Sequence, residues 1–347
     1  MTPTIGVPEV LARSRAAIGP AMAAALDRLN PEIRRVATYH VGWTDADGTP
    51  VESPGGKGIR PTLAMLSAEA AWADSALGIP GGVAVELVHN FSLIHDDIID
   101  RDTERHHRPT VWSVYGVGPA IVAGDALQVL AHQVLLESSP ERGAAASAAL
   151  ADATAAMIAG QAEDIAFEKR RDVTVEQCMA MSSAKTGALL GCASSIGAIL
   201  AGAPEATVWA LRDYGRHLGL AFQAVDDLLG IWGDPARTGK PAGSDLRQRK
   251  KSMPVVAALA AGGADSDELR SLVVGPVGAN GSLGPLTPDE VERAAYLVEA
   301  CGGRAWTAVR AKANLDTALG ALERVRLSAV PHRELADIAV FVLEREA

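Results

Sequence analysis

Three aspartates fall within five positions of the segment LIHDDIIDRD, directly after an apolar stretch. Like charges repel and burying a charge costs free energy, so Asp96, Asp97 and Asp100 need either an offsetting partner or a solvated surface. A hard cation is one such partner, because Mg²⁺ takes one or two carboxylates and completes its shell with water and phosphate oxygens. The alternative is a frayed, solvated helix end, but carboxylates are unfavourable near a helix C-terminus. The segment therefore favours a magnesium site.

A helix over residues 83–100 would position these carboxylates. The stretch VAVELVHNFSLIHDDIID contains no proline or glycine. Residues four apart share a helix face, so Asp96 and Asp100 become neighbours one turn apart. His89 lies two turns below Asp96 on nearly the same face, and Ser92 lies between them.

A second acidic pair, Asp226 and Asp227, ends another apolar helical run and precedes a Gly/Pro-rich loop that carries Lys240. Two helices that end in acidic groups, with basic residues nearby, suit one kind of site. Carboxylates hold Mg²⁺, the metal holds a diphosphate, and Lys or Arg neutralises the remaining phosphate charge.

The basic residues are present in three short segments, and no GxxxxGK[ST] loop indicates a P-loop nucleotide site. Taken singly, each of these basic residues is more commonly an ordinary surface charge. Together they favour phosphate binding. They are Lys57 and Arg60 in GGKGIRP, Arg105 and Arg108 in ERHHRPT, and Lys185, beside Thr186, in AKTG.

The composition predicts an all-α protein with a single domain over residues 1–347. The chain is 48% hydrophobic with only 4% aromatic residues and a net charge of −10. Helical periodicity recurs in most windows, and the longest break is the Gly-rich stretch 262–290. The acidic balance argues against nucleic acid as a partner, since such proteins normally carry a basic face.

We expect a cytoplasmic protein without a transmembrane segment. The start MTPTIGVPEV lacks a charged region followed by an apolar core. Three widely spaced cysteines, Cys178, Cys192 and Cys301, form no CxxC pair and indicate a reducing compartment. Residues 187–203 could mimic a membrane span, but their Gly, Ala and Ser content favours a closely packed buried helix.

Taken together, these motifs resemble the trans-isoprenyl diphosphate synthases, or polyprenyl synthetases, from about residue 10 to about residue 330. GGKGIRP is similar to the family's GGK-x-x-RP signature, and ELVHNFSLIHDDIID to its first aspartate-rich motif. The stretch GQAEDIAFE resembles the GQ-x-x-D helix, KTG the lysine motif, and FQAVDD with the following GD, TGKP and DL the second aspartate-rich motif.

The resemblance implies an all-α bundle around a deep central cavity, usually homodimeric. It implies a Mg²⁺-dependent reaction, with three ions when diphosphate is bound. An allylic diphosphate ionises and isopentenyl diphosphate attacks the carbocation. A proton then leaves, and the chain is five carbons longer. Metals and fixed cations stabilise the leaving diphosphate, and a closed apolar cavity keeps water from the cation.

The resemblance also implies a role for each matching position, and six of these residues form the predicted catalytic set: Asp96, Asp100, Arg105, Lys185, Asp226 and Lys240. The metal ligands are Asp96, Asp97, Asp100, Asp226 and Asp227. The allylic diphosphate is held by Arg105, Lys185, Thr186, Gln223 and Lys240, and isopentenyl diphosphate by Lys57, Arg60, His89 and His106.

Two positions depart from the family pattern. His106 stands where a second arginine often helps bind isopentenyl diphosphate, and it is mostly neutral at pH 7. Arg108 could compensate, or the affinity could be weaker. Gly230 replaces the third aspartate of the second motif, and water, Asp234 or Asp245 could fill that gap.

Product length in the family often depends on the residues four and five positions before the first motif, here Ser92 and Phe91. Ser92 is small, so a chain can pass it, whereas Phe91 lies about 7 Å further down the axis than Asp96 and could act as a stop. This combination is similar to geranylgeranyl (C20) synthases more than to farnesyl (C15) ones. The alternative is that Phe91 is a simple core aromatic.

Other functions on the same fold stay open: a farnesyl or longer-chain synthase, a non-catalytic subunit of a heteromeric prenyltransferase, and a terpene cyclase. A cyclase would make KTG and GGKGIRP superfluous. The wording of YHVGWTDADG and RHHRPTVW resembles a bacterial subgroup in which some members are packaged in encapsulin shells. Co-purification with a shell protein would test that packaging.

Overall fold

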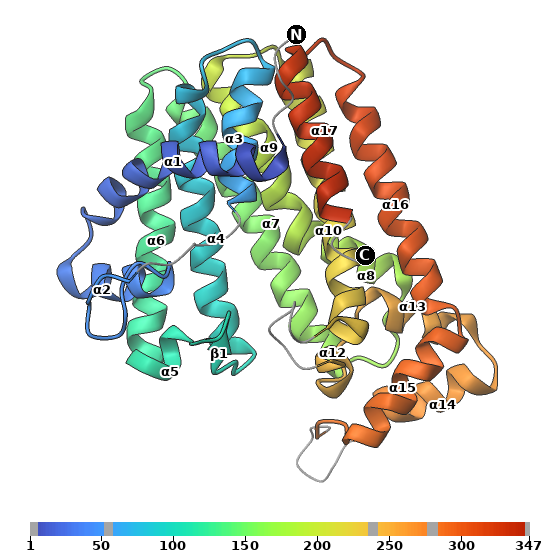
Figure 1. The fold of residues 1–347 in the computed structure, drawn as a ribbon. Helices are drawn as coiled ribbons and strands as arrows, with labels where there is room; N and C mark the ends of the chain where they lie inside the picture. The colour runs from blue at the N-terminus through green and yellow to red at the C-terminus, as the bar shows by residue number, and fades with distance from the viewer. Residues whose placement is uncertain (1–5, 52–57, 235–241, 276–283, 344–347) are drawn as a thin grey trace. The chain divides into compact units, whose positions relative to one another are not determined.

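The computed structural model describes residues 6–51, 58–234, 242–275 and 284–343, and these are almost entirely helical (Figure 1). The prediction of an all-α fold is confirmed. The helices are α1 (Val7–Leu26), α2 (Pro31–His40), α3 (Ile59–Ala70), η1 (Ser75–Gly78), α4 (Ile79–Ile99), α5 (Val111–Tyr115), α6 (Val117–Ser138), α7 (Gly143–Lys169), α8 (Val175–Ser182), η2 (Ser183–Gly187), α9 (Ala188–Ala201), α10 (Glu205–Trp232), α12 (Ser244–Arg247), α13 (Met253–Ala261), α14 (Ala264–Val273), α15 (Pro288–Ala300), α16 (Gly303–Leu322) and α17 (Ala329–Leu343).

The strands form one short antiparallel hairpin between α4 and α5, made of β1 (Glu104–Arg105) and β2 (Arg108–Pro109). Two of the predicted site residues, Lys57 and Lys240, lie outside the described residues.

The chain divides into two compact units, and each is considered by itself. Unit 1 contains Met1–Thr154, Leu189–Gly215 and Ala321–Ile338, and unit 2 contains Ala155–Ala188, Arg216–Gly320 and Ala339–Ala347. The first aspartate-rich segment belongs to unit 1 and the second to unit 2. A single domain over the whole chain stays a prediction.

In unit 1, α4 packs against both α3 and α6, and α1 crosses α3 and α4 (Figure 1). The helix can do this because apolar residues line most of its circumference, and Leu87 and Ile94 are fully buried. Helix α9 packs closely, since a Cβ at Gly197 would overlap the carbonyl of Ala64 on α3. The expected buried, small-residue helix over 187–203 is therefore present.

In unit 2, α13 contacts α8, α14 and α15 (Figure 1). One apolar cluster joins α13 to α14 and α15 through Val255, Leu269 and Leu297. Thr174 begins α8 with a capping box, in which its hydroxyl accepts from Gln177 N and the Gln177 side chain accepts from Thr174 N. These contacts hold the segments on either side of the second aspartate pair.

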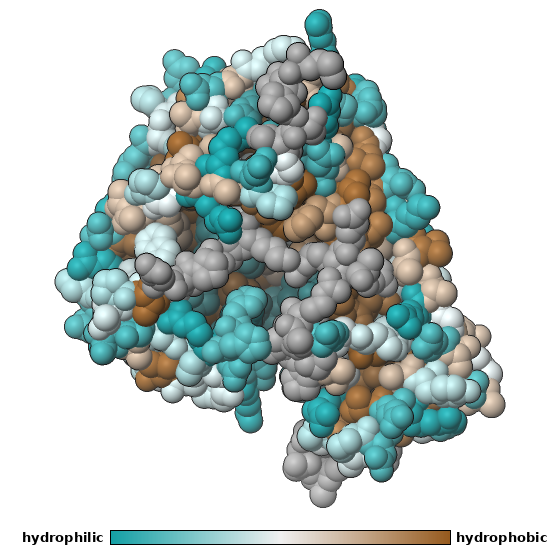
Figure 2. All heavy atoms as spheres, in the orientation of Figure 1, coloured by the Kyte–Doolittle hydropathy of each residue, from teal (hydrophilic) through white to brown (hydrophobic). Residues whose placement is uncertain are grey.

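Four helical stretches of the described chain are long and apolar enough to cross a membrane by length and composition alone: Ser75–Ile99, Val117–Ser138, Gly143–Lys169 and Val175–Ala201. Between 39% and 67% of each apolar window is already buried within the protein. On the face drawn in Figure 2, hydrophilic and hydrophobic residues are interspersed. The absence of a transmembrane segment stays a prediction.

Candidate functional site

The first aspartate-rich segment occupies the last turn of α4, as the spacing predicted. Asp96 and Asp97 lie inside the helix, and Asp100 is its C-cap, with its N–H donating to the Asp96 carbonyl at 2.8 Å. Asp96 and Asp100 are half-buried, whereas the Asp97 side chain is 1% exposed. The pair one turn apart is therefore distinguished from the aspartate between them.

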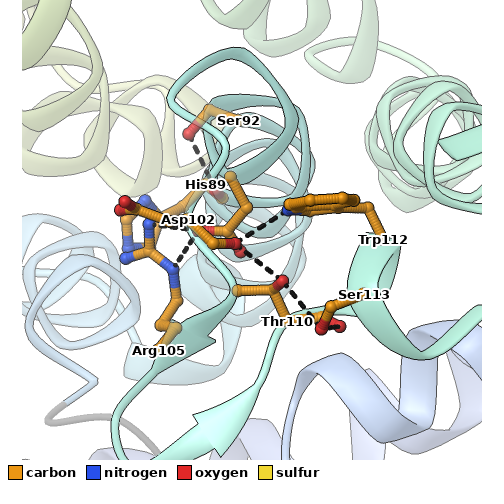
Figure 3. A network of polar contacts seen from close by, with 8 residues as sticks. His89, Ser92, Asp102, Arg105, Thr110, Trp112 and Ser113 are labelled. Atoms are coloured by element: carbon orange, nitrogen blue, oxygen red, sulfur yellow. Dashed lines mark hydrogen bonds and ion pairs between the residues drawn. The ribbon is translucent and has the colours of Figure 1, made fainter. Parts of the chain in front are cut away.

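Asp97 is held by Arg105 of the hairpin. Nε and Nη2 of Arg105 donate to Asp97 Oδ1 at 2.9 and 2.8 Å. The base of the hairpin is tied to the same helix end, because Thr110 Oγ1 and Trp112 Nε1 both donate to the Asp102 carbonyl at 2.8 Å (Figure 3). The sequence predicts Asp97 as a metal ligand and Arg105 as a diphosphate ligand. The structure brings these two side chains together as an ion pair.

The hairpin turn places His106 in a restricted backbone conformation. Arg105 pairs with Arg108 across the two strands, and His106 and His107 connect them with φ values of 51° and 60°. Two left-handed residues in a two-residue loop are the type I′ arrangement that matches strand twist, and His is among the non-glycine residues that tolerate it best. The family-pattern departure at His106 thus lies at the tip of a tight turn, which sequence reasoning did not predict.

Arg108 is committed to the end of α2. Its Nη2 donates to the Thr44 carbonyl at 2.8 Å and its Nη1 to the Tyr39 carbonyl at 3.3 Å, and its guanidinium lies 4.6 Å from the centre of the Tyr39 ring. Tyr39 in turn donates from its hydroxyl to the Pro109 carbonyl at 2.7 Å. These contacts do not favour Arg108 as the substitute for the missing arginine.

A second basic group lies where α3 faces α4. Arg60 Nη1 donates to His89 Nε2 at 3.1 Å, so the neutral imidazole carries its proton on Nδ1. Burial lowers the pKa of Arg60, with the Glu86 carboxylate acting in the opposite direction, and burial also raises the pKa of Glu86. The Nε of Arg60 is buried without a hydrogen-bond partner among the described residues. An anion would satisfy this donor.

His89 and His40 lie within a field of positive charge. Burial lowers the pKa of His89 well below 6.5, and Arg60 is the next cause. Burial also lowers the pKa of His40 to about 3, with Arg105 as the next cause and His106 and Arg108 contributing. Protonation of these two histidines is therefore unfavourable. This is expected of a positively charged site to which an anionic group binds.

The two residues expected to set product length are Phe91 and Ser92 on α4. Phe91 is 6% exposed and meets the His95 ring edge to face, with centroids 4.9 Å apart. His95 is itself fixed, because its Nε2 lies 3.2 Å from the Ile121 carbonyl. Ser92 is half-buried and donates to the His89 carbonyl at 2.8 Å. Phe91 is thus a rigid, buried ring, which fits both a floor and a core aromatic.

In unit 2, Lys185 lies on η2, a π-helical turn between α8 and α9. Such turns are frequent at functional sites. Its Nζ donates to Asp164 Oδ2 at 2.6 Å. Helix α7 approaches this turn closely, since a Cβ at Gly160 would overlap the main chain of Lys185. The glycine and the aspartate of GQAED therefore both serve to place Lys185.

The second aspartate pair continues a chain of hydrogen bonds. Thr186 Oγ1 donates to Gln223 Oε1 at 2.7 Å, and Gln223 Nε2 donates to Asp227 Oδ1 at 2.8 Å. The other oxygen, Oδ2, accepts from Met253 N at 2.9 Å. The pKa of Asp227 is raised to about 7, chiefly by burial and also by Asp245 and Asp226, while the donors Met253 N and Gln223 act in the opposite direction.

Asp226 is exposed, unlike its buried neighbour Asp227. Close to this pair, a Cβ at Gly230 would overlap the carboxylate of Asp245, at the start of α12. Asp245 thus fills the space beside the position where the family's third aspartate stands. Of the alternatives named for that gap, the geometry favours Asp245.

The donor chemistry of both segments fits Mg²⁺. Asp96 and Asp100 offer two carboxylates from neighbouring positions of one helix turn, and Asp226 offers an exposed carboxylate. Within the described ranges, no group of three or more His, Cys, Asp or Glu side chains converges as a complete metal cage. Mg²⁺ uses few protein carboxylates and completes its shell with water and phosphate.

Sequence reasoning missed the supporting residues. Asp164 lies in the stretch GQAEDIAFE, and the spacing of GQAED marks it, but no role was predicted for it. His40 gave no signal, because a single histidine at the end of a helix is unremarkable. The role of each predicted ligand otherwise stays a prediction.

Known proteins resemble this chain over nearly its whole length. A family model described as polyprenyl synthetase matches residues 48–276. The (2E,6E)-farnesyl diphosphate synthase of Mycobacterium tuberculosis is 46% identical over 338 residues, which cover 97% of this chain and 93% of that protein. The geranylgeranyl diphosphate synthase of the same species is 40% identical with the same coverage.

The fold also matches a solved structure. The polyprenyl synthetase from Streptomyces coelicolor A3(2) superposes with a TM-score of 0.91 at 51% identity, and the match covers 97% of this chain and 99% of that one. The two relatives from one species carry different product names, so resemblance alone does not identify the product of this chain.

We predict that His40 makes the protein less stable in acid. Its pKa falls from 6.5 to about 3 on folding, so its contribution is intact above pH 6.5 and is lost as the pH falls toward 3. Between pH 7.5 and 5.0 the free energy of unfolding should fall by about 2 kcal/mol through this residue. Urea unfolding of wild type and His40→Gln at both pH values measures it.

The matched control is His107→Asn, since the His107 side chain is 72% exposed and asparagine tolerates its backbone conformation. This variant should keep the wild-type pH dependence. An identical loss of stability in wild type and His40→Gln would contradict the prediction.

Proposed function

The chain belongs to the polyprenyl synthetase family, and from that premise we propose a Mg²⁺-dependent trans-prenyltransferase that makes geranylgeranyl diphosphate. The substrates would be isopentenyl diphosphate and an allylic diphosphate of five to fifteen carbons. The observation that carries the proposal is the buried Nε of Arg60, which has no hydrogen-bond partner in the described part of the chain and lies beside a neutral His89. A diphosphate oxygen would satisfy this donor.

Each unit contributes groups suited to one part of the reaction. In unit 1, Arg60 and His89 would bind the diphosphate of isopentenyl diphosphate. In unit 2, Lys185 is oriented by Asp164, and it would neutralise charge as the allylic C–O bond breaks and its electron pair leaves with the diphosphate. The double bond of isopentenyl diphosphate then forms the new C–C bond, and a proton leaves the adjacent carbon.

Mg²⁺ ions would be held by Asp96 and Asp100 in unit 1 and by Asp226 in unit 2, and when bound they supply charge stabilisation for the leaving diphosphate. Asp227 would support Asp226 through water. Asp245 stands beside Gly230, so it is our candidate for the third carboxylate of the second motif. The positions of Asp97 and Arg105 suggest a more structural part, in which the pair fixes the hairpin next to Asp96.

A C20 product is supported by Ser92, which leaves space, and by Phe91, whose ring is held by His95. The second candidate is farnesyl diphosphate, and the 46% identical relative of that name favours it. Both candidates use the same site and differ only in where the chain stops.

Homodimerisation is part of the proposal. Val122, Val129 and Leu136 on α6 are 53%, 58% and 54% exposed, and they recur every seven residues. Seven residues make about two helical turns, so the three side chains form one apolar stripe. A second copy of the chain could cover this stripe, because a stripe repeated on both copies is self-complementary about a two-fold axis.

The product assay tests the function directly. Purified protein with isopentenyl diphosphate, Mg²⁺ and a C5, C10 or C15 primer should give a C20 alcohol after phosphatase treatment. Asp96→Ala should reduce kcat by on the order of 100-fold, because a ligand for charge-stabilising metal is lost. The exposed Glu141→Ala is the control and should retain activity.

Two further variants test the stop position. Phe91→Ala should lengthen the product and Ser92→Phe should shorten it. A C15 main product from wild type would favour the farnesyl alternative, and no elongation with any primer would contradict the enzyme.

We predict that magnesium dependence changes with pH through Asp227. Its pKa is about 7 without metal, and a nearby cation favours the ionised form, so metal binding releases a proton. The half-saturating Mg²⁺ concentration should therefore fall by up to about tenfold from pH 6 to pH 8. The Asp227→Asn variant removes this titration while the substrates keep theirs. An equal pH dependence in both proteins would contradict the role of Asp227.

The apolar stripe predicts a dimer of about twice 36.0 kDa in solution. Val129→Glu with Leu136→Glu should shift the mass to that of one chain, because two carboxylates would be buried at the interface. Multi-angle light scattering measures the mass. Val309→Glu, at an apolar residue of α16 that is 66% exposed, is the control. A monomeric wild type, or a dimeric double variant, would rule out this interface.

A further inference from the structure

Unit 2 contains a cavity of about 310 Å³ that no step of the reaction uses. It lies between the segment that joins α7 to α8 and the ends of α13 and α14, which Figure 1 shows in the same region. Four basic side chains line it: Arg170, Arg171, Lys251 and Arg270.

Three of these cations are held by main-chain carbonyls. Arg171 Nη2 donates to Gly275 at 3.2 Å, Arg270 Nη2 to Leu259 at 2.9 Å, and Lys251 Nζ to Glu168 at 3.1 Å. Within the described part of the chain, none of the three forms an ion pair with a carboxylate within 4.0 Å. A carbonyl orients a cation but does not cancel its charge.

The remaining charges of the lining do not balance these three. Arg170 pairs with Asp172 at 2.9 Å, so those two cancel, and Glu176 offsets one further cation. Two positive charges are left over in the lining. The start of α8 already favours negative charge, because main-chain N–H and Thr174 hydrogen bonds lower the pKa of Glu176.

Lys251 makes the imbalance costly. It is only 7% exposed, and burial lowers its pKa, with Glu168 acting in the opposite direction and Arg249 in the same one. A charged ammonium in such a place gains from a nearby anion. The walls between the cations are apolar, formed by Val173, Val175 and Val274 among others.

From these contacts we infer that the cavity is a second anion site, which binds a diphosphate group without metal. The choice of diphosphate rests on the proposed function, since both substrates and the released product would carry this group. The volume and the apolar walls admit the free anion or the head group of a prenyl diphosphate.

The site adjoins the second aspartate pair within unit 2. The Lys251 carbonyl accepts from Cys178 Sγ at 3.4 Å, and two residues later Met253 N donates to Asp227. An anion bound at Lys251 would therefore act on the segment that positions Asp227. The expected effect is inhibition or retention of product at high diphosphate concentration.

The test is calorimetric titration of the full chain with inorganic pyrophosphate, and separately with geranyl diphosphate, in EDTA. Arg171→Gln with Arg270→Gln should weaken metal-free binding by about tenfold or more, because two charge-assisted donors are lost. Arg171→Gln with Arg270→Lys should restore part of the lost metal-free affinity. The control pair, Arg310→Gln with Lys312→Gln on α16, should bind as wild type does.

The two ligands separate the sources. Weakening of both supports recognition of the diphosphate group, and weakening of geranyl diphosphate alone supports a prenyl diphosphate that also uses the apolar walls. Equal affinity in wild type and the Arg171/Arg270 variant, or no metal-free binding by wild type, would overturn the inference.

Activity separates this inference from the proposed function. At low substrate, the Arg171/Arg270 variant should keep the wild-type kcat/KM, which also shows that it folds. A protein that binds pyrophosphate at this cavity but elongates no primer would retain the anion site and lose the proposed function. The reverse result would retain the enzyme and remove the site.

Discussion

Adjacent residues of an α-helix point about 100° apart, so two consecutive aspartates direct their carboxylates to different surroundings. This difference is seen in both aspartate pairs. At the end of α4, Asp97 is buried and Asp96 is half-buried, and at the end of α10, Asp227 is buried and Asp226 is exposed. In each pair the second carboxylate is the more buried one, and the first is the one that we propose as a metal ligand.

The two buried carboxylates are compensated in different ways. Asp97 is paired with a guanidinium, and removing one partner of such a pair typically costs about 3–5 kcal/mol. That pairing fixes the hairpin, and with it the position of His106. Asp227 instead receives an amide and a main-chain N–H, which carry no net charge. Its pKa consequently stays raised to about 7, and its ionisation depends on what binds nearby.

The positive side of the site shows the opposite imbalance. Arg60 has a buried donor that finds no partner within the described ranges, and His89 and His40 are kept neutral by burial and by neighbouring cations. Around the cavity of unit 2, cations likewise outnumber their carboxylate partners. Excess charge of this kind is costly in a folded chain and becomes favourable when an anion binds. Binding of an anion at these positions would therefore lower the free energy of the folded protein.

The amino-acid sequence determined the fold class and the identity of the two acidic helix ends, because helix periodicity and the like-charge clusters are local properties. It also marked Lys185, Gln223 and Arg60 through their motifs. Only the tertiary structure decided which aspartate of each pair is buried, that Arg105 binds Asp97, and that Arg108 donates to main-chain carbonyls at the end of α2. Those outcomes depend on how separate elements pack. Side chains that are far apart in the sequence can become partners in space, and no sequence spacing marks such a pair. For the same reason, the contact of Asp245 with Gly230 could be named as an alternative beforehand but was chosen only by geometry.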